Sequence, residues 1–167
     1  MDQITIERIK KAHPKLRNEL MYHYQEANKL LGKNVRLRFS YVYRSPEEQH
    51  AIFLQRPKVT KADAWQSIHN YGLAFDIVLL IDKDNNGNFE TVSWDMVQDF
   101  DLDKTPDWSE ITKYFLSNGY TNGFISNGKK WDYPHFQKDF GFHWSALKQR
   151  VDNGITIIDN GIIYPKI

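Results

Sequence analysis

The stretch Leu73-Ala-Phe-Asp-Ile-Val-Leu-Leu-Ile81 decides the fold, because its apolar run is interrupted by a single charged residue. A run of this length, rich in Ile, Val and Leu, is typical of a strand buried in the centre of a sheet. Asp76 is out of place there, since a carboxylate that is buried without a partner is energetically costly. We therefore expect Asp76 to be either a structural acid, paired with an Arg or with backbone amides, or the ligand of a metal ion.

The residues before this stretch predict two helices and another strand. Apolar residues recur at helical spacing from Pro14 to Leu31 and the pattern stops at Gly32, which predicts an amphipathic helix that follows a shorter one. Over residues 35–43, apolar and mostly polar residues then alternate, as in a half-buried strand. This strand places Arg44 at its end.

A helix start signal and several turn signals complete the pattern. Ser45 as N-cap, Pro46 at the first helical position and Glu48 in a capping box predict a helix through Gln55. The remaining expected segments are a loop at 56–67, a polar turn at 82–90, a strand near 91–94, helices at 105–116 and 144–151, and a short final strand. Because helices and strands do not alternate regularly, we expect an α+β fold with a mainly antiparallel sheet flanked by helices.

Length and composition predict one domain over residues 1–167, with 41% hydrophobic and 14% aromatic residues to fill its core. A net charge of +1 does not favour nucleic acid or an anionic membrane as the partner. No apolar run is long enough for a signal peptide or a membrane span, so we expect a protein that is made in the cytoplasm and does not insert into membranes. We also expect a monomer. The absence of cysteine excludes thiolate zinc sites, so any metal must be held by His and carboxylates.

Two histidines are candidates to join Asp76 in a metal site. His69 lies seven residues earlier, and a turn that ends at Gly72 could return its imidazole to the strand face that carries Asp76. His135 lies in the segment Asp132-Tyr-Pro-His135, where the proline restricts the backbone and keeps the preceding residue extended. Two imidazoles and one carboxylate suit zinc and leave its fourth position to water, which is the arrangement of a catalytic site.

The polar turn after the central strand raises the alternative of a second metal, calcium. If a calcium loop starts at Asp82, its first, third, fifth, seventh and ninth positions are Asp82, Asp84, Asn86, Asn88 and Glu90. However, Ser93 occupies the twelfth position of this loop pattern, where a bidentate Glu belongs. Clusters of Asp, Asn and Gly are also common in ordinary turns, so both interpretations stay open.

The other histidines and tryptophans carry weaker signals. Trp131 stands next to Asp132, so we expect it to line a substrate cleft, whereas core packing explains most of the other Trp residues. A lone His is more often structural than a ligand. We assign that structural role to His13, His23, His50 and His143.

The segment Ser67-Ile-His-Asn-Tyr-Gly-Leu-Ala-Phe-Asp76 matches all five fixed positions of the pattern S-x-H-x-x-G-x-A-x-D. By this pattern the chain resembles the zinc D-Ala-D-Ala carboxypeptidases and dipeptidases and the phage L-alanyl-D-glutamate endopeptidases, or endolysins. Tyr43-Arg-Ser45 with Glu48-Gln49 is similar to the upstream arginine and helix of this family, and Asp132-x-x-His135 to its acid and second histidine. The resemblance covers roughly residues 38–141 and implies the hedgehog-like fold of these peptidases.

The resemblance also implies roles for individual residues. The implied zinc ligands are His69, Asp76 and His135. By the same comparison, Asp132 is the general base, Arg44 contacts the substrate or the transition state, and Ser67 helps to bind substrate. The carboxypeptidase branch usually has Glu as the acid and Trp before the second His, whereas this chain has Asp132 and Pro134. That difference favours the endopeptidase branch.

We therefore expect a zinc peptidase that cuts the L-alanyl-D-glutamate bond of bacterial peptidoglycan, used by a phage to lyse its host after release through a separate membrane pore. One alternative is a D-Ala-D-Ala carboxypeptidase of cell-wall metabolism with the same fold. Another is a non-catalytic zinc module that only binds, because the hedgehog signalling domain shares this fold. The presence of Asp132 and Arg44, where a catalyst needs them, favours an enzyme over the binding module.

Overall fold

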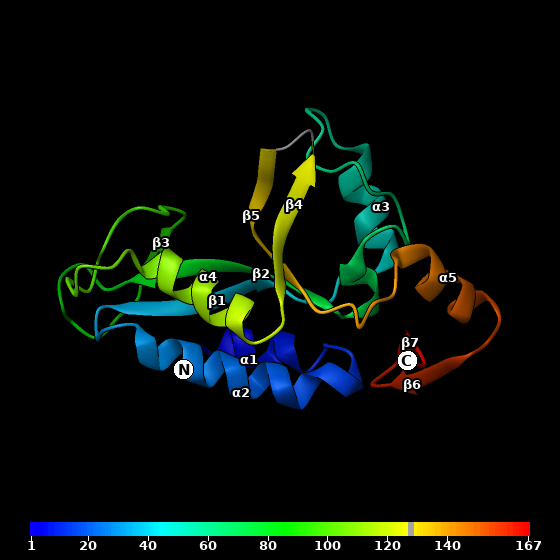
Figure 1. Ribbon diagram of the computed structural model, residues 1–167, viewed down its shortest axis with the longest axis horizontal. Coiled ribbons are helices and arrows are strands. Elements are labelled where there is room, and N and C mark those ends of the chain that lie inside the picture. The colour runs from blue at the N-terminus through cyan, green and yellow to red at the C-terminus, as the bar shows by residue number, and fades with distance from the viewer. Residues whose placement is uncertain (127–128) are drawn as a thin grey trace.

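The computed structural model describes residues 1–126 and 129–167, and within them the chain forms five α-helices, one short 3-10 helix and two antiparallel sheets (Figure 1). The helices are α1 (Gln3–Ile9), α2 (Pro14–Leu30), α3 (Pro46–Leu54), η1 (Ile68–Tyr71), α4 (Asp107–Ser117) and α5 (Trp144–Asp152). The strands are β1 (Val35–Tyr41), β2 (Ala74–Ile81), β3 (Thr91–Ser93), β4 (Thr121–Ser126), β5 (Lys129–Gln137), β6 (Thr156–Asp159) and β7 (Ile162–Pro165). The predicted α+β class with a mainly antiparallel sheet is confirmed. Among the helices of the described residues, none has the length and apolar character needed to cross a membrane.

The main sheet is built around β2, the strand predicted to be central. The strand order is β1-β2-β5-β4, and β3 pairs with the end of β2. β5 pairs with residues 74–76 of β2 and β3 with residues 79–81, so these two strands share the edge that faces away from β1. Hydrogen bonding on both edges and burial along nearly its whole length explain why β2 is almost entirely apolar.

The helix-covered face of the sheet carries an aromatic core. Phe75 of β2 stacks on Phe39 of β1 with ring centroids 4.4 Å apart, and on Phe136 of β5 at 5.4 Å. Phe115 of α4 closes this cluster, and all four side chains are fully buried. α1 and α2 lie beneath the sheet in Figure 1. Because side chains alternate along a strand, Asp76 points to the opposite face.

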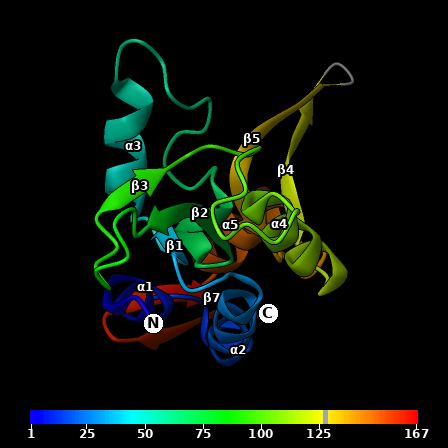
Figure 2. The same ribbon diagram turned by 90° about the vertical axis from the view of Figure 1, so that its left-hand side faces the viewer.

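The β4–β5 hairpin is the largest element that the sequence does not predict. Its strands contain Gly123 and Pro134, both of which are unfavourable inside strands, and its register shifts between Asn122 and Phe124. The hairpin is held in place because β5 also pairs with β2. Figure 2 shows this hairpin and α3 projecting from the sheet on opposite sides, away from α1 and α2.

The C-terminal segment forms a hairpin, β6–β7, where the sequence predicts a single short strand. The hydroxyl of Tyr164 donates to the carbonyl oxygen of Lys11, and His13 Nε2 lies 2.9 Å from the carbonyl oxygen of Pro165. These contacts fasten the C-terminus to the connection between α1 and α2. His13 is therefore structural, as predicted, and it also caps α2.

Gly72 ends η1 at the point where the chain turns into β2. Its φ is +66°, and a Cβ there would lie 2.6 Å from the backbone nitrogen of His13. Gly72→Ala is expected to lower the free energy of unfolding by at least about 2 kcal/mol, because left-handed strain and a backbone clash add together. Gly154→Ala is the matched control, because it has a φ of +67° but meets nothing within 4 Å. Urea unfolding compares the two variants, and equal losses would contradict the close approach to His13 as the cause.

Candidate metal centre

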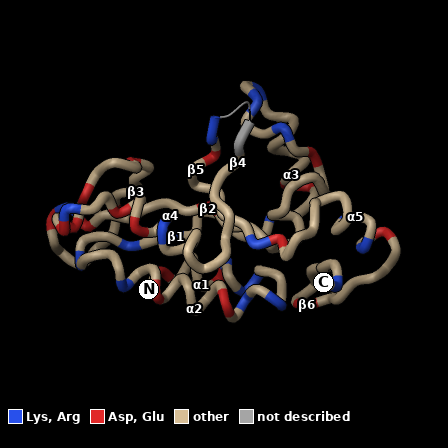
Figure 3. The backbone as a smooth tube through the Cα atoms, viewed as in Figure 1, with Lys and Arg blue, Asp and Glu red and all other residues tan. Residues whose placement is uncertain are grey.

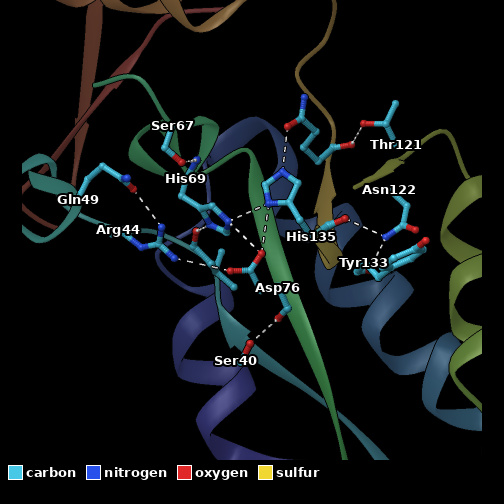
Figure 4. Close-up of polar contacts among 12 residues, drawn as sticks. Ser40, Arg44, Gln49, Ser67, His69, Asp76, Thr121, Asn122, Tyr133 and His135 are labelled. Atoms are coloured by element: carbon cyan, nitrogen blue, oxygen red, sulfur yellow. Dashed lines mark hydrogen bonds and ion pairs between the residues drawn. The ribbon is translucent and has the colours of Figure 1, made fainter. Parts of the chain in front are cut away.

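Three side chains meet on the face of β2 that points away from the aromatic core (Figure 4). Asp76 of β2 and His135 of β5 are direct partners in the antiparallel register, so their side chains lie on one face. His69 comes from η1, whose first turn is capped by Ser67, and its imidazole reaches the same point. The structure thus brings together the three residues that the sequence predicts as metal ligands.

The inward atoms of these residues form a nearly equilateral triangle. His69 Nε2 lies 3.1 Å from His135 Nδ1, and each nitrogen lies 3.2 Å from Asp76 Oδ1. Nitrogen ligands of a tetrahedral zinc at about 2.0–2.1 Å are about 3.3 Å apart. The triangle therefore has the dimensions of one face of such a site.

Hydrogen bonds on the far side of each ring determine where the imidazole protons lie. His69 Nδ1 donates to the carbonyl oxygen of Val42 at 2.7 Å, and His135 Nε2 donates to Gln137 Oε1 at 2.9 Å. Gln137 is held in turn by Asp139, because the side-chain Nε2 of Gln137 donates to Asp139 Oδ2 at 2.9 Å. Each neutral ring therefore directs the lone pair of its other nitrogen inward. Two lone pairs beside a carboxylate require a shared proton or a cation between them.

The groups around the triangle favour the ionised form of Asp76. Burial alone raises the pKa of this carboxyl, but His69 and His135 hold it well below its usual range. Burial lowers the pKa of His135, yet the hydrogen bond with Asp76 and its charge outweigh this effect and raise it. Arg44 Nη2 is 3.6 Å from Asp76 Oδ2, which is longer than a charge-assisted hydrogen bond. The arginine is thus not the main partner of Asp76, and the metal-ligand interpretation fits better than the structural ion pair.

Arg44 is fixed at the edge of the triangle. Its Nη1 donates to Gln49 Oε1 at 3.0 Å, and the fully buried Gln49 donates to the carbonyl oxygen of Ala62 at 2.7 Å. The guanidinium also lies over the ring of Tyr41, 4.6 Å from its centroid. Ser45, the residue after Arg44, caps α3, so the predicted cap and helix place Gln49 beside Arg44.

A cleft of about 610 Å³ opens over the triangle. The predicted catalytic and substrate-binding residues all line this cleft: Arg44, Ser67, Trp131 and Asp132. Phe124 of β4 forms part of the wall, with its ring 4.7 Å from that of His135 and 5.1 Å from that of Trp131. The cleft thus combines a metal-binding triangle, an acid, a guanidinium and an aromatic wall.

Asp132 is one of two acids that line the cleft without belonging to the triangle, and the other is Asp139, which holds Gln137. The backbone of Asp132 has a φ of +57°, a conformation that is costly for a residue other than Gly and that is often found at functional sites. Burial raises the pKa of Asp132, and the negative charge of Asp76 raises it further. A carboxylate with a raised pKa is a stronger proton acceptor, so Asp132 is suited to act as a base.

Sequence reasoning missed the groups that hold the ligands from behind. The carbonyl of Val42 carries no sequence signal, because every residue has one. Gln137 could have been found, since it lies two residues after His135 and therefore on the same face of the strand. His143 lines the cleft but accepts a hydrogen bond from the backbone nitrogen of Ser145, so it caps α5 as a structural residue should.

The predicted calcium loop after β2 gains no support. Asp82 Oδ1 and Oδ2 accept hydrogen bonds from the backbone nitrogens of Asn86 and Gly87 at 3.1 and 2.8 Å, so both of its oxygens already have partners within the turn. Within the described residues, the acids of this turn do not come together as a metal-binding group. The plain-turn interpretation is thus favoured for Asp82, Asp84, Asn86, Asn88 and Glu90.

Comparison with known proteins agrees with the geometry. The family described as D-alanyl-D-alanine carboxypeptidase matches residues 60–138, which include the triangle and Asp132. The peptidoglycan L-alanyl-D-glutamate endopeptidase CwlK of Bacillus subtilis is 35% identical over 101 residues, which are 57% of this chain and 56% of that protein. The chain therefore spans just over half the length of this relative.

A solved structure shows the same fold. The L-Ala D-Glu endopeptidase ChiX of Serratia marcescens has a TM-score of 0.56 to this chain and 19% sequence identity, and the match covers 84% of this chain and 90% of that one. At this identity the likeness concerns the fold alone. The family model and the curated relative thus support the resemblance that the sequence motif predicts, to the zinc D-Ala-D-Ala carboxypeptidases and L-alanyl-D-glutamate endopeptidases, and the solved structure supports the fold.

Proposed function

We propose that this protein is a zinc peptidase that hydrolyses the L-alanyl-D-glutamate bond in the stem peptides of bacterial peptidoglycan. The observation that carries the proposal is the triangle of His69, Asp76 and His135, whose inward atoms border a cleft that also contains Asp132. Imidazole and carboxylate ligands suit zinc, and three protein ligands leave one position for water. A structural zinc site would instead have four protein ligands.

The residues of the cleft divide the chemistry between them. Zinc bound by the triangle supplies Lewis acidity, which lowers the pKa of water and polarises a peptide carbonyl. Asp132 accepts the proton of the attacking water, which its raised pKa favours, and delivers it to the leaving amine. Arg44, held by Gln49, donates to the oxygen that becomes negative as the water adds.

Two features favour an endopeptidase over a carboxypeptidase. The segment Asp132-Tyr-Pro-His135 lacks the Glu and the Trp that are usual in the carboxypeptidase branch, and both relatives are named as endopeptidases for this bond. Lys61 also lines the cleft, with its ammonium 5.8 Å from the ring centroid of Trp131. A lysine in the wall offers an ion pair to the free α-carboxyl group beside the bond to be cut, and because both the D-Glu of the stem and a terminal D-Ala carry this group, Lys61 fits either substrate.

Mass spectrometry of purified wall after digestion tests the bond that is cut. We expect fragments with a new N-terminal D-Glu. Release of D-Ala alone would reject this bond and support the D-Ala-D-Ala carboxypeptidase alternative. A protein that binds zinc but leaves the wall intact would support the non-catalytic module instead.

We further propose that the activity serves a phage at the end of infection, in a monomer made in the host cytoplasm that reaches the wall through a separate membrane pore. The similarity to phage endopeptidases in the motif and in Asp132 supports this role. Co-expression with a pore-forming membrane protein in bacteria whose wall the enzyme digests is expected to cause lysis, whereas Asp132→Ala is not. Equal lysis by both proteins would contradict the role.

The hydrogen bond between His135 and Gln137 gives a prediction for zinc affinity. Gln137→Leu removes the acceptor that orients the imidazole, so the affinity is expected to fall by about 10- to 100-fold. Gln137→Glu is the comparison variant, because it keeps the oxygen that accepts from His135 while it loses the donor to Asp139, and it should retain zinc. Titration against a chromogenic chelator measures both affinities. If the Leu variant binds zinc as tightly as the Glu variant, the hydrogen bond does not orient His135.

A further inference from the structure

The connection between β3 and α4 contains the segment Asp99-Phe-Asp-Leu-Asp-Lys-Thr-Pro-Asp-Trp-Ser-Glu110. It matches the twelve-residue calcium loop better than the turn at Asp82 does, with Asp at the first, third, fifth and ninth positions and the bidentate Glu110 at the twelfth. α4 begins at Asp107, so the loop runs into a helix as the pattern requires. The departure is Lys104 at the sixth position, normally Gly, but its φ of +80° is the left-handed conformation that a sharp turn needs.

The fold brings the acids of this segment together. Carboxylate oxygens of Asp99, Asp101 and Asp103 lie within 4.8 Å of one another, and those of Asp101, Asp107 and Glu110 do so as well. Because Asp101 belongs to both groups, the five carboxylates form one cluster. Calcium is held by six to eight oxygens at about 2.3–2.6 Å. Five carboxylates, with the main-chain carbonyl that the pattern assigns to Thr105, provide enough oxygens.

Two carboxylate oxygens of the cluster are buried and form no hydrogen bond with any described residue. The side chain of Asp107 is 0% exposed, and its Oδ2 accepts a hydrogen bond from the backbone nitrogen of Phe100 at 2.7 Å. Its Oδ1 has no hydrogen-bond partner among the residues that the structure describes, and the same is true of Glu110 Oε2. Since buried polar atoms are almost always satisfied, these two oxygens indicate a ligand.

The negative charge of the cluster is not balanced by the protein. Across residues 1–126 and 129–167, none of the five acids forms an ion pair with a basic side chain. Burial and the four aspartates raise the pKa of Glu110 to about 7, which reflects the concentration of like charge around it. A bound cation would neutralise this charge and satisfy the buried oxygens at once.

We propose that this cluster is a calcium site, separate from the zinc centre, whose ligands are Asp99, Asp101, Asp103, Asp107 and Glu110. A ligand set of oxygens alone favours calcium over zinc. Asp101 Oδ2 also accepts a hydrogen bond from the backbone nitrogen of Gly32 at 2.6 Å, so the ion would fasten the start of α4 to the end of α2. Figure 3 shows acidic segments at the end of the molecule near β3, and none of the five acids lines the cleft. The site thus stabilises the fold and takes no part in the chemistry.

Calorimetric titration of the zinc-loaded protein with calcium chloride, in calcium-free buffer, tests the site. We expect a single calcium ion per chain with a Kd of about 10⁻⁵ to 10⁻³ M, because Lys104 and the missing entry helix weaken the loop. Glu110→Gln removes the charge of the bidentate ligand and is expected to weaken binding at least about 10-fold. Asp84→Asn, in the turn after β2, is the matched control and should bind calcium as the wild type does.

Thermal melting gives a second reading of the same variants. Calcium at about 100 times its Kd is expected to raise the melting temperature of the wild type by roughly 5–10 °C. Glu110→Gln is isosteric and relieves repulsion, so without calcium it should melt above the wild type, and calcium should reverse this order. The proposal is overturned if the wild type binds no calcium up to about 10 mM, if Glu110→Gln binds it as tightly as the wild type, or if Asp84→Asn loses binding.

Discussion

Asp132→Asn is expected to slow peptidoglycan cleavage by about 100- to 10,000-fold, because a general base contributes a factor of this size. The amide preserves the shape of the side chain but cannot accept the proton of the attacking water. Asp132 is not part of the triangle, whose three ligand atoms meet without it. The variant should therefore keep its zinc. Release of new amino groups from purified wall measures the rate, and atomic absorption measures the zinc content.

Two further variants make this result specific. Asp132→Glu keeps a carboxylate at the same backbone position and should retain much more activity than Asp132→Asn. Asp152→Asn removes an exposed acid of α5 that pairs with Lys148 and does not line the cleft. This variant should cleave at the wild-type rate. Wild-type cleavage by Asp132→Asn would contradict its role as the base. Loss of zinc from Asp132→Asn would instead show that the residue acts in metal binding.

The helices and strands that could be predicted are those with a recognisable local sequence pattern. β2 is apolar because it is bonded on both edges and covered on both faces, and α3 begins where its cap and proline indicate. β4 and β5 could not be predicted, because Gly123 and Pro134 disfavour a strand locally. Their pairing depends on the contact of β5 with β2, between residues far apart in the sequence. Long-range pairing of this kind leaves little trace in a local pattern.

The candidate site likewise contains residues that could be predicted from the sequence and residues that could not. The metal ligands could be predicted because His69 and Asp76 belong to one short segment and Asp76 is a charge in an apolar strand. The carbonyl of Val42 and the side chain of Gln49 could not, since their role depends on what the fold places beside them. Of the two acidic loops, the sequence prediction considered only the turn after β2, although the loop before α4 matches the calcium pattern more fully. The burial of Asp107 is what separates the loop before α4 from the ordinary turn after β2.

Removal of zinc with phenanthroline is expected to abolish wall cleavage completely, and one equivalent of zinc should restore it. Asp132 and Arg44 remain in the stripped protein, but the Lewis acid that lowers the pKa of water and polarises the peptide carbonyl is gone. Phenanthroline binds transition metals through nitrogen and leaves calcium in place, so the site before α4 is undisturbed. Added calcium should not restore cleavage. Activity in protein whose zinc content is below detection would contradict the proposed mechanism.

Removal of zinc is also expected to lower the melting temperature, by an amount that increases with pH. Zinc at about 1,000 times its Kd contributes about 4 kcal/mol, or roughly 8–16 °C for a chain of this size. In the zinc-free protein burial lowers the pKa of His135, but Asp76 raises it to above the ordinary value of 6.5. A group whose folded pKa is raised stabilises the fold below its unfolded pKa, and this stability is lost as pH rises through the folded pKa.

The proton shared by Asp76 and His135 therefore takes the place of the metal at low pH and is lost at high pH. As pH rises above 6.5, the zinc-free protein should become less stable, while zinc binds more tightly because protons no longer compete for its ligands. Both effects widen the gap between the melting temperatures of the two forms. Thermal melts of both forms across this pH range measure the gap, and a gap that stays constant or narrows would show that the two residues do not share a proton in the absence of zinc.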